Sequence, residues 1–194
     1  PLGLDADDPD FADYKPHGPE LIVMPEGRGA NPVLARLIEE ADADYLMLGG
    51  DDMVYRTQGW DEIIERAFTE IPDDMGILYF DNGNGRDIAE AVAVSKKWTQ
   101  AAEPFVWPQF EHFFTDAIMM EVAIRVGRMR RVPSILIEHM HYKYGKGELD
   151  LTYRSKRNDG MPRRDKDRYI ELRPQIDEVI ERMRRLCGAE KIAA

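Results

Sequence analysis

The sequence predicts an α/β fold in which a mostly parallel sheet is flanked by helices and followed by a C-terminal helical extension. Strand-like and helix-like segments alternate along the chain, which is typical of a sheet built with crossover connections. The clearest strand, residues 45–48, is a short apolar run (Tyr-Leu-Met-Leu) that is too short for a helix. A run of this kind indicates a buried strand of a parallel sheet.

The first part of the chain predicts three strands and two helices. Strands are expected over residues 2–5 and 20–25, and the second closes at Pro25. A helix begins at Asn31 and Pro32, because proline is favoured at the first helical position, and its apolar residues continue at helical spacing to Ile38. After the strand over 45–48, a second helix is expected over 60–69.

The second part predicts three more strands, over residues 76–80, 91–94 and 133–137, and a short helix over 96–102. A longer helix over 116–126 ends at Gly127, since glycine readily takes the left-handed conformation that follows a helix. The polar, basic stretch 143–168 predicts a loop. The apolar face of a final amphipathic helix is marked by Ile176, Val179, Ile180 and Met183.

Composition limits the classes of function. A length of 194 residues fits one domain, or one domain over 1–153 followed by a basic loop and helical appendage over 154–194. The net charge of −11 argues against a protein that mainly grips the nucleic-acid backbone. No apolar run approaches the roughly 20 residues of a membrane span. The single cysteine, Cys187, and the lack of a signal-peptide pattern lead us to expect a cytoplasmic protein.

The strand over 45–48 ends in two glycines and two adjacent acids, Asp51 and Asp52. Open α/β sheets bind their ligands beyond the carboxyl ends of the strands, which is where these carboxylates are expected. Two adjacent carboxylates repel each other unless a cation compensates them, and a hard divalent ion that also binds phosphate oxygens would do so. The alternative is a solvated Asp-Asp pair that caps the helix near Trp60.

This segment, Tyr-Leu-Met-Leu-Gly-Gly-Asp-Asp-Met over 45–53, followed by Gly-Trp-Asp over 59–61, resembles the metal-binding region of GT-A fold glycosyltransferases. The resemblance is to family-2-like members, including phage-type variants, and it implies a Rossmann-like sheet. It also implies that Asp52 of the "DXD" motif binds Mn²⁺ or Mg²⁺ directly and that Asp51 is a ligand or a ribose-side contact. The chain is expected to lack the family's first βα unit, because Leu2 lies in what resembles the second strand.

A second group of residues precedes the helix over 116–126. Thr115 or Asp116 is suited to capping that helix. Alternatively, a carboxylate at this position can face a cleft and accept a proton from a sugar hydroxyl. Phe-Thr-Asp over 114–116 resembles the acidic motif that carries the catalytic base of inverting glycosyltransferases, and by this resemblance Asp116 is the base.

Two histidines, His139 and His141, end the strand that starts near residue 133. Residues i and i+2 of a strand share a face, so both rings can address one point, and imidazole is a common metal ligand. The alternative is a polar loop. The succession Phe-Thr-Asp, Glu-His-Met-His and Asp-Leu-Thr-Tyr again resembles phage-type members. It implies that His139 is the third metal ligand and that His141 contacts the diphosphate or the acceptor.

Three weaker interpretations concern the donor. By the resemblance, Asp5 and Asp7 contact the nucleoside, although a plain acidic loop explains them equally well. Arg28, beside two glycines, either reaches a phosphate or lies in a solvated turn. Trp107, between Val106 and Pro108, is a candidate for stacking on a sugar.

Together these motifs predict a metal-dependent, hexosyltransferase-type glycosyltransferase that inverts configuration. The expected cofactor is Mn²⁺ or Mg²⁺, the donor is a nucleotide-diphosphate sugar, and the acceptor is a hydroxyl on a glycan, a protein or a modified nucleic acid. Two alternatives stay open. One is a non-catalytic or truncated nucleotide-sugar-binding domain, and the other is a nucleotidyltransferase.

Overall fold

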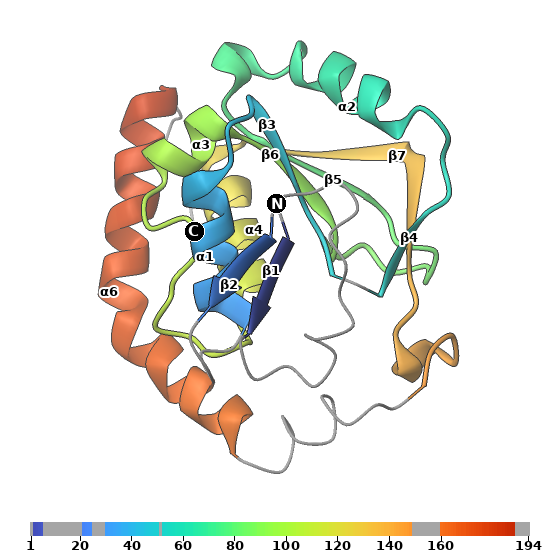
Figure 1. The fold of residues 1–194 in the computed structure, drawn as a ribbon. Helices are drawn as coiled ribbons and strands as arrows, with labels where there is room; N and C mark the ends of the chain where they lie inside the picture. Colours follow the sequence, from blue (N-terminus) through green and yellow to red (C-terminus); the bar gives the residue numbers. More distant parts are fainter. Residues whose placement is uncertain (1, 6–20, 25–29, 51, 149–159, 189–194) are drawn as a thin grey trace.

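The computed structural model describes residues 2–5, 21–24, 30–50, 52–148 and 160–188 (Figure 1). The strands are β1 (Leu2–Asp5), β2 (Leu21–Met24), β3 (Tyr45–Leu48), β4 (Met53–Tyr55), β5 (Ile77–Asp81), β6 (Val92–Ser95) and β7 (Met129–His139). The helices are α1 (Ala30–Glu40), α2 (Trp60–Phe68), α3 (Lys96–Ala101), α4 (Thr115–Val126) and α6 (Met161–Cys187), with 3₁₀ turns η1 (Pro72–Asp74) and η2 (Tyr142–Tyr144).

The main sheet has the strand order β3-β6-β5-β7-β4, and β1 and β2 form a separate parallel pair that contacts α1. Within the described residues, β5 and β7 are parallel, whereas the β3–β6, β5–β6 and β4–β7 pairs are antiparallel. The α/β class and the flanking helices are therefore confirmed. The mostly parallel, Rossmann-like sheet is not, because the sheet is mixed. The short connection from β5 to β6 contains no helix, and parallel neighbours need a longer crossover.

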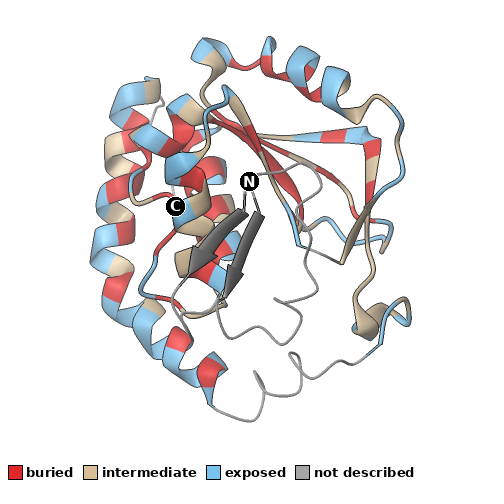
Figure 2. Cartoon of the chain, viewed as in Figure 1, coloured by how far each residue is buried: buried red, intermediate tan, exposed pale blue. Residues whose placement is uncertain are grey.

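Helices cover both faces of the sheet. In Figure 1, α2 lies over one face, and α1, α4 and α6 lie on the other side. The side chains of β6 alternate accordingly. Val92 and Val94 pack in the cluster that includes residues of α4 and α6, whereas Ala93 packs with residues of α2 such as Phe68. The buried strands of Figure 2 thus form the centre of a three-layer arrangement.

Strand β7 changes partners along its length. Its first part pairs with β5 up to Phe80 and Val132, but the next pair is Asp81 with Leu136, so residues 133–135 form an irregularity in the register. Pro133 stands at this point and has no N–H to donate to a ladder. The strand bends here (Figure 1), and its last residues pair with β4. The bend brings the end of β7 to the residues that follow β3.

Helix α6 begins at Met161, so the loop expected up to residue 168 is wrong for its last part. The predicted apolar face is confirmed, since Ile176, Val179, Ile180 and Met183 are all buried. These side chains belong to the same core cluster as residues of α4 and β6. The helix therefore contributes to the core that supports the sheet. The proposed boundary near residue 153 falls within residues 149–159, outside the described part, and stays a prediction.

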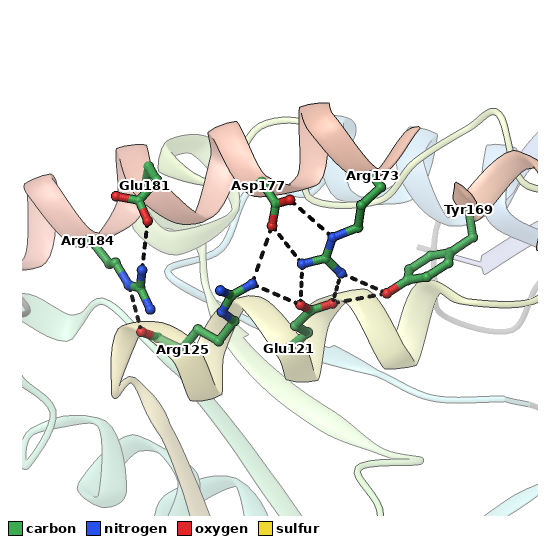
Figure 3. Close-up of polar contacts among 7 residues, drawn as sticks. All are labelled: Glu121, Arg125, Tyr169, Arg173, Asp177, Glu181 and Arg184. Carbon is green, nitrogen blue, oxygen red and sulfur yellow. Dashed lines mark hydrogen bonds and ion pairs between the residues drawn. The ribbon is translucent and has the colours of Figure 1, made fainter. Parts of the chain in front are cut away.

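A polar cluster joins α6 to α4 (Figure 3). Arg173 donates to Glu121 Oε1 from Nη2 at 2.6 Å and to Glu121 Oε2 from Nη1 at 2.8 Å, and its Nη2 also donates to Asp177 Oδ1 at 2.6 Å. The hydrogen bonds and positive charge of Arg173 hold the pKa values of the Glu121 and Asp177 carboxyls below their usual range. Arg173 is thus the centre of a charge-assisted network between the two helices.

Arg173→Gln is expected to lower the free energy of unfolding at pH 7 by about 2 kcal/mol, because partly buried Glu121 loses its bidentate partner. A carboxyl with a depressed pKa contributes stability above its ordinary pKa, and this contribution is lost as the pH falls. The difference between the two proteins should therefore shrink as the pH falls below the ordinary values of 4.5 and 3.8. Urea unfolding at pH 7 and pH 3 measures this difference in the free energy of unfolding.

The exposed pair of Arg168 and Glu171 supplies the control, since Arg168→Gln should change stability by less than about 1 kcal/mol. Equal losses in the two variants would contradict the assignment.

Candidate functional site

A cleft of about 370 Å³ lies between the end of β3, the start of α4 and the end of β7. Three residues that the sequence predicted for the site, Asp116, His139 and His141, line it together with Glu90. A larger hollow of about 450 Å³, between α1 and α3, contains none of the predicted site residues. The smaller cleft is therefore the candidate site, because the residues with suitable chemistry converge there.

Asp52 and His139 are in contact although they are 87 residues apart in sequence: His139 Nε2 lies 3.0 Å from Asp52 Oδ2. The pairing of β4 with β7 explains this, since Met53 lies opposite His139. The next backbone N–H, that of Met140, donates to the carbonyl of Asp52 at 2.8 Å. The bend of β7 and the short strand β4 together fix this contact.

Glu90 completes the surroundings of His139 and was missed by sequence reasoning. Its Oε2 lies 3.0 Å from His139 Nδ1 and accepts from Asn82 Nδ2 at 2.8 Å. Its Oε1 accepts from the hydroxyl of Tyr144 at 3.2 Å. One weak signal existed in the sequence. Glu90 precedes β6 by two residues, so an extended chain places it on the same face as Val92.

The two carboxylates determine the charge of His139. Contacts with Asp52 and then Glu90 raise the pKa of His139 to about 9. Burial alone would raise the pKa of Glu90, but its contacts with His139, Tyr144 and Asn82 lower it below the usual range. Burial, followed by the positive charges of His139 and Lys143, lowers the pKa of His141. The neighbouring imidazoles thus differ, since His139 favours its charged form and His141 its neutral form, and a cation bound at Nε2 of His139 would displace the proton there.

Asp52 and His139 fit the chemistry of a divalent cation. Two ligands at right angles, each about 2.1 Å from an ion, are about 3.0 Å apart, which is the separation of Asp52 Oδ2 and His139 Nε2. Among the described residues, no three His, Cys, Asp or Glu side chains are grouped so as to hold a metal. Mg²⁺ commonly keeps several waters and binds one or two carboxylates together with substrate phosphates. The pair can therefore form part of a coordination shell that phosphates and water complete.

Asp116 is the second residue of α4, and it is exposed on the cleft. Neither Thr115 nor Asp116 is the N-cap residue, which is Phe114, and this N-cap makes no side-chain hydrogen bond. The hydroxyl of Thr115 is buried and donates to Asn31 Oδ1 at 2.6 Å. The carboxylate of Asp116 accepts from the N–H of Ala117 at 2.8 Å. Asp116 is thus placed to accept a proton from a molecule in the cleft.

The other predicted residues either lie outside the described part of the chain or belong to the core. Asp51, Asp7 and Arg28 lie outside the described residues, and only the backbone of Asp5 is described, at the end of β1. Trp107 is 2% exposed and packs in the core, so the prediction that it stacks on a sugar is wrong. The two residues before it, Phe105 and Val106, are also buried, so this part of the loop packs against the core.

Comparison with known proteins gives no assignment: no family model, curated protein or solved structure matches this chain. In the described part of the chain, no helix is long and apolar enough to cross a membrane. The chemistry of the cleft therefore carries the functional argument, together with the motifs in the sequence.

Proposed function

We propose that this protein is a metal-dependent glycosyltransferase of the GT-A type, which transfers a hexose from a nucleotide-diphosphate donor to an acceptor hydroxyl. The observation that carries the proposal is that exposed Asp116 lines the same cleft as His139, whose Nε2 contacts Asp52. The three residues come from separate motifs of the chain. A cation site and a proton acceptor at one cleft are the two functions that such a transfer needs.

In this proposal, Asp52 and His139 hold Mn²⁺ or Mg²⁺, which supplies positive charge for the departing diphosphate. Glu90 faces the Nδ1 side of the His139 ring and thereby orients Nε2 toward Asp52. A carboxylate behind a ligating histidine commonly fixes the tautomer of the ring in this way. His141 lines the same cleft and contacts the diphosphate or the acceptor.

Asp116 acts as the general base in this proposal. Its carboxylate accepts the proton of the acceptor hydroxyl as that oxygen attacks the anomeric carbon, which inverts the configuration of the sugar. The exposure of Asp116 on the cleft and its place in the first turn of α4 support this role. The acceptor is proposed as a hydroxyl of a glycan, a protein or a modified nucleic acid.

We expect UDP or GDP to bind at least about tenfold more tightly with Mn²⁺ than without it, because diphosphate oxygens complete the shell begun by Asp52 and His139. Asp52→Ala should abolish this difference, as measured by calorimetry. Asp44→Ala, which removes an exposed carboxylate from the opposite end of β3, is the matched control and should leave it unchanged.

Two results separate the alternatives. Nucleotide affinity that is insensitive both to the metal and to Asp52→Ala would refute the metal site. Metal-dependent binding without release of nucleoside diphosphate from any of a panel of nucleotide sugars would instead favour a non-catalytic binding domain.

A further inference from the structure

A buried carboxylate of α6 binds the segment that leads into α4. The N–H groups of Glu111, His112 and Phe113 donate to the two oxygens of Asp165 at 2.9, 3.0 and 2.8 Å. Asp165 is 1% exposed. Within the described residues, these three amides are its hydrogen-bond partners and no basic side chain forms an ion pair with it. Such charge-assisted bonds offset the cost of burying the carboxylate.

The same segment is held on its other side by α1. Asn31 donates from its backbone N–H to the carbonyl of Glu111 and from Nδ2 to the carbonyl of Phe113, both at 3.4 Å. Its Oδ1 accepts from the hydroxyl of Thr115 at 2.6 Å. Asp165 therefore binds three backbone donors of the segment, while Asn31 binds two of its backbone carbonyls and the hydroxyl of Thr115.

The held segment forms one wall of the cleft. His112, Phe113, Thr115 and Asp116 all line it. Between them, Phe114 has a φ of 73°, a left-handed conformation that is unfavourable for a residue with a side chain. Its ring stacks on Tyr169 of α6, with the ring centroids 4.9 Å apart. A strained residue immediately before α4 persists only when its surroundings hold it, and here α6 supplies two of those contacts.

We propose that Asp165 is a positioning residue for Asp116. By binding three successive amides it fixes the turn at Phe114, and this turn sets the direction in which α4 presents Asp116 to the cleft. The inference rests on the proposed function for the role of Asp116. It assigns to α6 a part in the site as well as in the core. A neutral amide at position 165 would keep the shape but would place an NH₂ group against backbone donors, so at least one of the three bonds would be lost.

The test is Asp165→Asn in the full chain, with two readouts. In the free protein, amide hydrogen exchange at residues 111–115 should become at least about tenfold faster. With the nucleotide sugar that the wild-type protein turns over best, kcat should fall by on the order of 100-fold, because a misplaced base loses its alignment. The Kd of Mn²⁺–UDP should change by less than about twofold, since Asp52 and His139 are not touched.

Arg125→Gln is the matched control, because it removes an ion pair with Asp177 of α6 in the last turn of α4, at the end of that helix away from the segment. It should leave kcat and the exchange at residues 111–115 near their wild-type values. If Asp165→Asn does not fold, Asp165→Glu replaces it. This variant keeps the charge but moves the carboxylate by one methylene, and the same readouts should change in the same direction.

Unchanged exchange at residues 111–115, or an unchanged kcat despite faster exchange, would overturn the inference. A wild-type protein that turns over no nucleotide sugar would overturn the proposed function. In that case the exchange data still decide whether Asp165 holds the segment.

Discussion

Asp116→Asn is expected to abolish sugar transfer while leaving donor binding nearly intact. The amide has the size of the acid, and its oxygen can still accept from the N–H of Ala117, but it cannot take a proton from the acceptor. Loss of a general base typically lowers the rate by about 10²–10⁴-fold, and we expect this loss in kcat. Steady-state kinetics and calorimetry with Mn²⁺–UDP measure the two quantities separately.

Asp61→Asn is the matched control for this experiment. Asp61 is likewise an exposed aspartate at the second position of its helix, α2, but it does not line the cleft. Both substitutions remove a negative charge near a helix N-terminus and should have similar small effects on stability. An Asp116→Asn variant with near-wild-type kcat, or one that unfolds while Asp61→Asn does not, would return Asp116 to a structural role.

The second large effect is expected at His139. His139→Ala should weaken the metal-dependent binding of UDP by on the order of 100-fold, because it removes one of the two described side chains that fit the ion and leaves Asp52 without its neighbour. His141→Ala should weaken it by less than about tenfold. The ring centroids of His139 and His141 are 5.1 Å apart. The Nδ1 of His141 already accepts from the N–H of Lys143 at 3.1 Å.

Titration of each variant with UDP, with and without Mn²⁺, separates the two roles. Binding without metal should be the same in His139→Ala and in the wild-type protein. If the two histidine variants lose equal affinity, or if His139→Ala weakens binding equally with and without Mn²⁺, His139 is not a ligand of the ion.

Local pattern was enough to predict most elements. The strand over residues 45–48 was predicted with its observed bounds, and the helix expected over 116–126 begins one residue earlier, at Thr115. These elements were predictable because the length of an apolar run and a following glycine are properties of the local sequence. Strand direction is not such a property. The antiparallel neighbours of β6 and the change of partner within β7 depend on which distant segments pair.

The candidate site was predictable where a motif marks it. The motifs indicated Asp52, His139 and Asp116, and the structure brings all three to the region of one cleft. Glu90 and Asp165 carry no such mark, since each is a single acid in an unremarkable local context. Asp165 in particular accepts from backbone amides more than 50 residues away in sequence. A local sequence pattern cannot identify such distant partners. Strand β4 was not recognised because it has only three residues and depends on its pairing with β7.

The long separation between Asp52 and His139 has a consequence for the order of folding. Closing a loop of 87 residues costs conformational entropy that one hydrogen bond does not offset, so the contact forms only when the sheet between the two residues is in place. During synthesis, the chain must be complete beyond His139 before this pair can exist, and beyond Asp165 before the opposite wall of the cleft is held. The cleft is thus a late product of folding. A ligand that needs both walls selects the fully folded chain and stabilises it as a whole against global unfolding.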